Sequence, residues 1–338
     1  MLDKSRSVLI TGAAGQDGLL LARLLGREGY KVIGQVRDAN QGIRFLKYCP
    51  NGITAIGSVT DAGFIENTVR IHSPGAIVNL AAASSVAGSW QSASTTISTN
   101  SAAVASLLDL VRERHVAGDS ITFYQASSSE MFGLPNGAQV DELTPLRPTS
   151  PYAISKVAAH ELAQCFRTAY GLDVRIGILF NHESPLRKEQ FLTRKISSSV
   201  ARIATGRQKI LELGDLEIRR DWGYAGDFAE AIKRILEAAA PEDYIVATGE
   251  THSVSDLVSY AFNHVGLQNW GKYVVSSEKH FRPLDHPPVS ADNRKIRQSL
   301  GWAPTKNIGE TIREMVDFDL GLLESNSLEK EWMPSGQT

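Results

Sequence analysis

A glycine-rich turn between two apolar segments constrains the fold of this chain more than any other feature. Residues 7–11 read SVLIT, Gly12 to Gly18 read GAAGQDG, and leucines then recur at helical spacing until Gly29. A strand, a turn with GxxGxxG spacing and a helix are typical of the first βαβ unit of a dinucleotide-binding domain. Glycines there let the backbone approach a pyrophosphate, and the helix start offers unpaired N–H donors. A bare tight turn is the plainer interpretation, but the position between strand and helix favours a dinucleotide site.

Strand and helix patterns alternate through the first half of the chain. The strand patterns lie at 30–36, 53–56, 76–80 and 121–125, and the helical patterns between them lie at 64–71 and 102–112. Such alternation is typical of parallel sheets whose crossover helices cover both faces. It predicts an α/β fold, a Rossmann-type doubly wound parallel sheet.

The pattern becomes less regular after residue 180. Asp227 is predicted to cap a helix, and Ser253 with Asp256 is typical of a capping box at the start of another. We predict a dinucleotide-binding Rossmann domain at 1–180, to which strands and helices from 220–260 return, a smaller mixed α/β substrate lobe at 181–324, and a tail at 325–338.

Composition excludes several classes of function. The 35 Lys and Arg residues nearly balance the 37 Asp and Glu residues, so no basic surface for nucleic acid or anionic membranes is expected. No apolar run approaches the ~18 residues of a membrane-spanning helix. The only two cysteines, Cys49 and Cys165, have no metal-ligand spacing. We therefore expect a cytoplasmic protein with reduced thiols, no metal site, no membrane anchor and no nucleic-acid partner.

The end of the second strand bears on the choice between NAD and NADP. A carboxylate there binds the ribose 2′-hydroxyl of NAD, whereas an arginine accommodates the 2′-phosphate of NADP. The chain has both, Arg37 and Asp38, so these residues alone leave the choice open.

Tyr152 and Lys156 are the strongest catalytic candidates. Ser150 and Pro151 are typical of a helix start, which places Tyr152 and Lys156 four residues apart on one helical face. An ammonium beside a phenol lowers the phenol pKa from about 10 toward neutrality, so the phenolate can take and return a hydroxyl proton. An isolated pair of this kind is more often structural, but the upstream glycine turn favours catalysis.

Ser128 and Glu130 follow the strand at 121–125, at the end of a parallel sheet where ligands bind. If the extended backbone continues, both side chains point to the same side. A helix cap and a solvated glutamate are the plainer interpretation. Beside Tyr152, however, the serine could orient a substrate oxygen and Glu130 could act as a separate acid or base. A dehydratase needs that second base, and a simple alcohol dehydrogenase does not.

Motifs of one enzyme family occur in order along nearly the whole chain. They include TGAAGQDG from Thr11, FYQASSSEMFG from Phe123, SPYAISK from Ser150, GILFNHESPLR from Gly177 and RRDWG from Arg219. The chain therefore resembles the extended short-chain dehydrogenase/reductases and, within them, the GDP-mannose 4,6-dehydratase family. The resemblance implies a lyase that converts GDP-mannose to GDP-4-keto-6-deoxymannose with a bound nicotinamide cofactor, NADP, with NAD not excluded.

The resemblance also implies a mechanism. Tyr152, poised by Lys156, removes the proton of the sugar 4-hydroxyl as hydride passes to the nicotinamide, and Ser128 binds that oxygen. Glu130 then abstracts the proton at C5 and assists loss of water from C6, to which the hydride returns. The alternatives are a GDP-sugar reductase or epimerase of the same fold, or a non-catalytic dinucleotide sensor. Glu130 beside Ser128 argues against the former, and Tyr152 with Lys156 argues against the latter.

The resemblance extends to the binding residues and the assembly. It assigns the cofactor to Gly12, Gly15, Gln16, Asp17, Gly18, Arg37, Ser58, Val59, Leu80, Ala81, Ala82, Tyr152, Lys156, His182 and Arg187. It assigns the GDP-sugar substrate to Ser84, Ser85, Ser128, Asn181, Lys195, Arg220, Arg282 and Asp285. A homodimer or homotetramer is implied, with 102–112 and 153–170 as candidate interface helices.

The chain departs from the family pattern at a few of these places. Asp38 stands where the family has a second arginine, Ser58 where it has an aspartate, Ala83 where it has a glutamine, and Asp285 where it has a glutamate. These positions flank the cofactor and nucleotide regions, so a changed substrate is the alternative that they raise.

Overall fold

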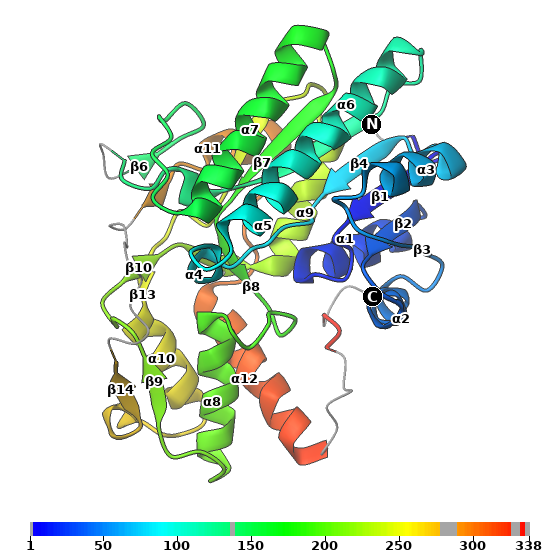
Figure 1. Ribbon diagram of the computed structural model, residues 1–338. Helices are drawn as coiled ribbons and strands as arrows, with labels where there is room; N and C mark the ends of the chain where they lie inside the picture. Colours follow the sequence, from blue (N-terminus) through cyan, green and yellow to red (C-terminus); the bar gives the residue numbers. More distant parts are fainter. Residues whose placement is uncertain (1–2, 136–138, 278–288, 326–331, 335–338) are drawn as a thin grey trace. The chain divides into compact units, whose positions relative to one another are not determined.

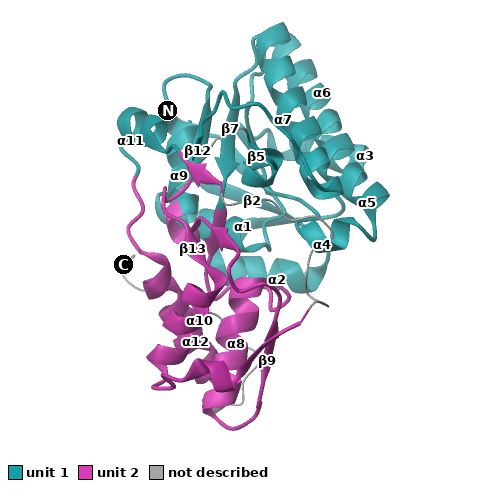
Figure 2. Cartoon of the chain, turned by 90° about the vertical axis from the view of Figure 1, so that its left-hand side faces the viewer, with its two compact units in different colours: residues 1–180, 228–246, 292–302 teal, residues 181–227, 247–291, 303–338 magenta. Residues whose placement is uncertain are grey.

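The computed structural model describes residues 3–135, 139–277, 289–325 and 332–334 (Figure 1). The chain divides into two compact units, coloured separately in Figure 2. Unit 1 comprises 1–180, 228–246 and 292–302, and unit 2 comprises 181–227, 247–291 and 303–338. Two later segments of the chain thus belong to the unit formed by its first half.

A seven-stranded parallel sheet forms the centre of unit 1. In spatial order its strands are β12 (Asp243–Val246), β7 (Val174–Leu179), β5 (Thr122–Ser128), β4 (Ala76–Asn79), β1 (Ser7–Thr11), β2 (Lys31–Val36) and β3 (Ile53–Ile56). The direction of strand progression reverses between β1 and β4, where such sheets bind ligands. The predicted Rossmann-type doubly wound sheet is confirmed.

Helices flank this sheet in two layers, which explains why its strands are nearly continuous apolar runs. Helices α3 (Ala62–His72), α6 (Ala103–Val116) and α7 (Pro151–Tyr170) pack side by side. Helices α1 (Gln16–Arg27) and α2 (Ala39–Tyr48) pack together, and an ion pair between Lys233 and Glu28 ties α9 (Ala225–Glu237) to the end of α1. The shorter elements are α4 (Val86–Ser89), α5 (Ala93–Ile97), a π-helix (Ser98–Ala102), a 3-10 turn (Ser129–Met131), β6 (Gln139–Val140) and α11 (Arg294–Leu300).

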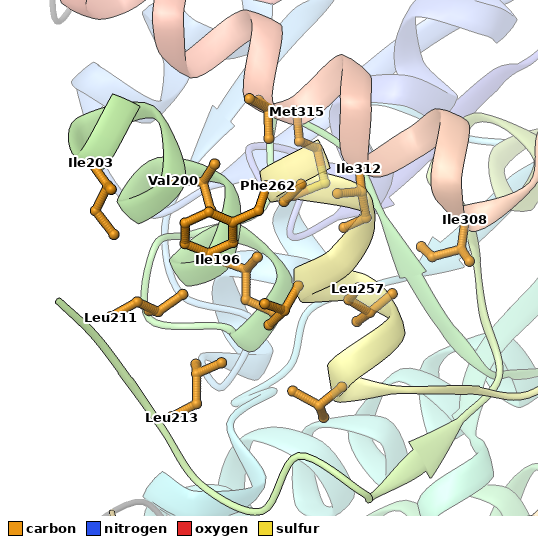
Figure 3. Close-up of a cluster of buried hydrophobic side chains, with 14 of the residues drawn as sticks. Ile196, Val200, Ile203, Leu211, Leu213, Leu257, Phe262, Ile308, Ile312 and Met315 are labelled. Atoms are coloured by element: carbon orange, nitrogen blue, oxygen red, sulfur yellow. The ribbon is translucent and has the colours of Figure 1, made fainter. Parts of the chain in front are cut away.

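Unit 2 has its own hydrophobic core, to which three helices contribute most of the buried side chains (Figure 3). These are α8 (Leu192–Ala204), α10 (Val254–His264) and α12 (Ile308–Ser325). Val200, Phe262 and Ile312, one from each helix, are fully buried in this cluster. The short strands are β8 (Asn181–Glu183) with β11 (Trp222–Tyr224), β10 (Arg219–Arg220) with β13 (His252–Ser253), β9 (Leu211–Leu213) with β14 (Val274–Ser276), and β15 (Ser290–Ala291); Trp270–Lys272 form a 3-10 turn.

The two predicted helix caps differ in outcome. The capping box is confirmed, since Ser253 Oγ accepts from the N–H of Asp256 and the Asp256 carboxylate accepts from the N–H of Ser253. The N-cap prediction for Asp227 is wrong, because this residue lies in the first turn of α9. Its carboxylate instead accepts from the N–H and hydroxyl of Thr305, at 2.8 and 2.6 Å. A contact distant in sequence thus takes the place of a local cap.

Candidate active site

The glycine turn joins β1 to α1 at the point where the strand order reverses. Gly12 has φ +66°, and a Cβ added to it would lie 2.8 Å from the Cα of Ala81, just after β4. A Cβ on Gly18 would lie 2.6 Å from the Cα of Ala13. Both positions therefore require glycine, because any side chain would push directly against backbone.

The start of α1 fits a pyrophosphate. Its N-cap residue is Gly15, which has no side chain to accept from the first-turn N–H groups. An α-helix leaves those N–H groups without helical partners, and its dipole favours a negative charge there. Gln16 and Asp17 occupy the first turn, where Gln16 Nε2 donates to Asp17 Oδ1 at 3.2 Å. Leu80, Ala81 and Ala82 follow β4 beside the turn, where Ala81 closely approaches Gly12.

The carboxylate of Asp38 at the end of β2 is committed to local structure. Asp38 is the N-cap of α2, and its side chain accepts from the N–H of Gln41 at 2.9 Å. Arg37, immediately before it, has an exposed side chain. Ser58 is exposed and its hydroxyl lies 2.7 Å from that of Thr60, while Val59 is buried. Both residues of the charged pair at this strand end are exposed, but the Asp38 carboxylate accepts the capping hydrogen bond of α2.

Helix α7 positions Tyr152 and Lys156. Ser150 caps it by accepting from the N–H of Ala153 at 3.1 Å, and Pro151 fits its first turn. Tyr152 is 8% exposed and Lys156 is 5% exposed, and Lys156 Nζ lies 6.0 Å from the centre of the Tyr152 ring. Lys156 Nζ also donates to the carbonyl of Ala126, in β5, at 2.8 Å. The structure thus brings both predicted side chains together at the end of β5.

Burial tunes the charge of Lys156. It lowers the pKa of this ammonium to about 8, and the negative charge of Asp17 opposes the shift. At neutral pH the group therefore carries its proton but holds it less tightly than an exposed lysine does. This ammonium lies beside the Tyr152 ring, as the predicted catalytic pair requires.

Ser128 and Glu130 lie close together, but not in the predicted way. The extended backbone ends at Ser128, and Ser129–Met131 form a 3-10 turn. The premise that the strand continues through Glu130, so that both side chains point to the same side, is therefore wrong. The Ser128 hydroxyl accepts from the N–H of Glu130 at 3.3 Å, and both residues are buried. A short polar segment favours a turn because its own side chain can satisfy the backbone.

Asn100 is a buried residue that sequence reasoning missed. It lies in the π-helix, where its Oδ1 accepts from the N–H of Ala83 at 2.8 Å and its Nδ2 donates to Ser155 Oγ at 2.9 Å. It therefore links the segment after β4 to the turn of α7 that carries Tyr152. Of the nearby predicted substrate residues, Ser84 is exposed and Ser85 caps α4 by accepting from the N–H of Gly88. No local sequence signal marks a π-helical turn.

Asn181, a predicted substrate residue of unit 2, contacts a polar cluster around Asp221. Asn181 Nδ2 donates to the carbonyl of Asp221 at 3.2 Å, where β8 pairs with β11. The Asp221 carboxylate accepts from the N–H groups of Thr248 and Gly249. Burial raises the pKa of Asp221 to about 6, although these hydrogen bonds oppose the shift. Asp221 was not among the predicted residues, yet it fixes the loop beside Asn181.

The other predicted site residues of unit 2 that the structure describes are His182, Arg187, Lys195 and Arg220. His182 and Arg220 are buried, and the guanidinium of Arg187 stacks over the Phe191 ring at 4.0 Å. Arg187 Nε also lies 3.3 Å from a carboxylate oxygen of Glu183. Partial burial lowers the pKa of Lys195. Arg282 and Asp285 lie outside the described residues.

Within the described ranges, no cluster of three or more His, Cys, Asp or Glu side chains is arranged to hold a metal ion. Across the same part of the chain, no helix has the length and apolar character needed to cross a membrane.

The Rossmann sheet, the glycine turn after β1 and the Tyr-x-x-x-Lys pair on α7 define the class of extended short-chain dehydrogenase/reductases. The structure of DesIV, a dTDP-glucose 4,6-dehydratase from Streptomyces venezuelae with NAD and TYD bound, matches with a TM-score of 0.80 and 26% identity, over 95% of this chain and 98% of that chain. The UDP-glucose 4-epimerase from Bifidobacterium longum, in complex with NAD+ and UDP, gives a TM-score of 0.81 at 20% identity, over 95% and 99% of the two chains. The second match shows a shared fold alone.

Within that class, the chain belongs to the GDP-mannose 4,6 dehydratase family, whose model matches residues 9–315. GDP-mannose 4,6 dehydratase 2 of Arabidopsis thaliana is 39% identical over 333 residues, covering 95% of this chain and 89% of its own. GDP-mannose 4,6 dehydratase of Homo sapiens is 38% identical over 352 residues, covering 96% and 94%. The family indicated by the sequence motifs is confirmed.

Proposed function

We propose that this protein is a GDP-mannose 4,6-dehydratase, which converts GDP-mannose to GDP-4-keto-6-deoxymannose and releases water. The observation that carries the proposal is the meeting of two pairs in unit 1. Tyr152 and Lys156 on α7 lie at the end of β5, where Ser128 is the last residue of the strand and Glu130 lies in the 3-10 turn that follows it. One pair suits the oxidation of an alcohol, and the other adds the base that an elimination requires.

Each of these four side chains has a chemical task. The Tyr152 phenolate, stabilised by the Lys156 ammonium, takes the proton of the sugar 4-hydroxyl, and the Ser128 hydroxyl orients that oxygen. The resulting 4-ketone acidifies the C5 proton, which Glu130 removes before it protonates the departing 6-hydroxyl.

The cofactor completes the chemistry. When bound, a nicotinamide dinucleotide would supply the hydride acceptor for oxidation at C4 and the hydride donor for reduction at C6, so no external reductant would be consumed. The glycine turn and the start of α1 would hold its pyrophosphate. At Gly12 and Gly18 the turn packs too closely against neighbouring backbone to admit a side chain, and Gly15 leaves the helix start without a side-chain cap. Lys195 and Arg220 of unit 2 carry the charge suited to the diphosphate of the GDP moiety.

The function is tested by mass spectrometry. The purified protein is incubated with GDP-mannose and either NADP or NAD, without reductant, in light and heavy water. We expect a product lighter than the substrate by one water, with one solvent deuterium at C5 in heavy water. A protein that binds GDP-mannose but returns it unchanged with both cofactors would overturn the proposal. A product of unchanged mass with new stereochemistry would indicate an epimerase, and a requirement for NADPH would indicate a reductase.

We infer NADP as the preferred cofactor, because Arg37 is exposed at the end of β2 while the Asp38 carboxylate is committed to capping α2. Replacing Arg37 with Ala should raise KM for NADP about tenfold or more and change KM for NAD by less than about threefold, since a charge-assisted bond to the 2′-phosphate is lost. Lys47→Ala, which removes an exposed cation of α2, is the matched control. Equal effects of Arg37→Ala on the two cofactors would contradict the inference.

We also propose that the protein acts in the cytoplasm as a homodimer or homotetramer. Both cysteines are free thiols, which suits a reducing compartment. Ile154 on α7 and Val116 at the end of α6 are exposed apolar residues on the candidate interface helices. Light scattering at micromolar concentration should give two or four times the chain mass, and a monomer would contradict the assembly.

A further inference from the structure

A buried network of polar side chains crosses three adjacent strands of unit 1. Thr11 ends β1, Asn79 ends β4 and Gln125 lies in β5, and none of them is more than 3% exposed. Thr11 Oγ1 donates to Asn79 Oδ1 at 2.7 Å, and Asn79 Nδ2 donates to Gln125 Oε1 at 2.9 Å. The chemistry proposed above uses none of these side chains.

Backbone groups fix the direction of this polar chain. At one end, the N–H of Ala81 donates to Thr11 Oγ1 at 3.1 Å, so the hydroxyl proton of Thr11 is left for Asn79. That choice orients the amide of Asn79, which in turn orients the amide of Gln125. At the other end, Gln125 Nε2 donates to the carbonyl of Ala126 at 3.0 Å. Every donor along the chain therefore points toward this carbonyl.

The Ala126 carbonyl is also the acceptor of Lys156. Lys156 Nζ donates to it at 2.8 Å, so one oxygen receives both the ammonium and the Gln125 amide. Aligned hydrogen bonds polarise one another in an interior of low dielectric constant. The hydrogen-bonded side chains of Thr11, Asn79 and Gln125 thus fix the Ala126 carbonyl oxygen that accepts from the ammonium. They also place the positive end of their dipoles beside the ammonium. Tyr152 on α7 and Asp17 on α1 are the ionisable groups that act on Lys156 from the neighbouring elements.

We propose that Gln125, held by Asn79 and Thr11, is a positioning residue that fixes the Ala126 carbonyl and thereby sets the place and charge of Lys156. Because Thr11 directly precedes Gly12, the same polar chain ties the glycine turn to the catalytic lysine. The proposal rests on the proposed function for the importance of Lys156 to catalysis. The coupling between Gln125 and Lys156 is a property of the protein without substrate, and it is tested there.

The test follows Lys156 directly by NMR. In protein labelled with ¹³C at the lysine Cε, the Lys156 signal is assigned by its loss in Lys156→Met. Gln125→Leu removes a positive dipole end beside the ammonium, so the pKa of Lys156 should rise by about half a unit or more above its wild-type value of about 8. Ser127→Ala is the matched control, because Ser127 is an equally buried neighbour whose hydroxyl lies 3.0 Å from His160 Nδ1, outside the polar chain. That control should leave the pKa within about 0.2 units.

A second measurement needs no variant in the polar chain. In the wild-type protein, the side-chain ¹⁵N signal of Gln125 should shift with the same midpoint as Lys156. A Gln125 amide that does not respond, or a Gln125→Leu titration equal to that of Ser127→Ala, would overturn the proposal. In turnover, Gln125→Leu should lower kcat about tenfold with KM for GDP-mannose within about threefold. A wild-type protein without turnover would refute the proposed function, and the two NMR results would still decide the role of Gln125.

Discussion

Tyr152→Phe is expected to lower kcat for the loss of water from GDP-mannose by about 10²–10⁴-fold, the usual contribution of a positioned acid–base group. The ring stays in place on α7 and only the hydroxyl is removed, so the proton of the sugar 4-hydroxyl has no acceptor. KM for GDP-mannose should change little, since the phenol acts mainly in the transition state. The measurement is steady-state kinetics with mass spectrometry of the product.

Tyr124→Phe is the matched control for this change. Tyr124 lies in β5, is fully buried, and its hydroxyl has no hydrogen-bond partner among the described residues. Removing that hydroxyl should leave kcat within about threefold and should not lower the free energy of unfolding, because an unpaired buried hydroxyl costs about 1–3 kcal/mol. If Tyr152→Phe kept more than a tenth of the wild-type kcat, a different group would have to be the base.

The sequence predicts the sheet well because its signals are local. Strands β1 (Ser7–Thr11) and β3 (Ile53–Ile56) have the predicted limits, since a short apolar run ended by glycine allows few alternatives. The pairing of Tyr152 with Lys156 is local too, because helical spacing places residues four apart on one face. The return of residues 292–302 to unit 1 has no such local signal.

Contacts between distant segments explain what the sequence did not predict. Asp227 is a residue type that often caps helices, but its carboxylate instead accepts hydrogen bonds from Thr305, which is distant in the sequence. Asn100 becomes a link between two segments only because a π-helical turn directs its amide at Ala83 and Ser155. The 3-10 turn at Ser129–Met131 differs, because its cause is local: the Ser128 hydroxyl accepts from the N–H of Glu130.

Glu130→Gln is expected to lower kcat for loss of water by about 10²–10⁴-fold while leaving oxidation at C4 intact. The amide keeps the size of the side chain and the hydrogen bond from its own N–H to Ser128 Oγ, but it cannot remove the C5 proton. Two signals should separate this variant from Tyr152→Phe. In heavy water neither variant should incorporate deuterium at C5. Quenching with borodeuteride should label C4 in Glu130→Gln, where the ketone forms, and not in Tyr152→Phe.

Glu142→Gln provides the control for loss of a carboxylate in the same unit. Glu142 accepts from the N–H of Ile245 at 2.8 Å, and glutamine can accept the same bond, so kcat should stay within about threefold of wild type. Deuterium at C5 in the Glu130→Gln product would show that another group removes this proton. In that case Glu130 would be a buried partner of the 3-10 turn, and the distinction between a dehydratase and an epimerase site would have to come from a different residue. The borodeuteride label therefore decides whether the two pairs of side chains act in sequence.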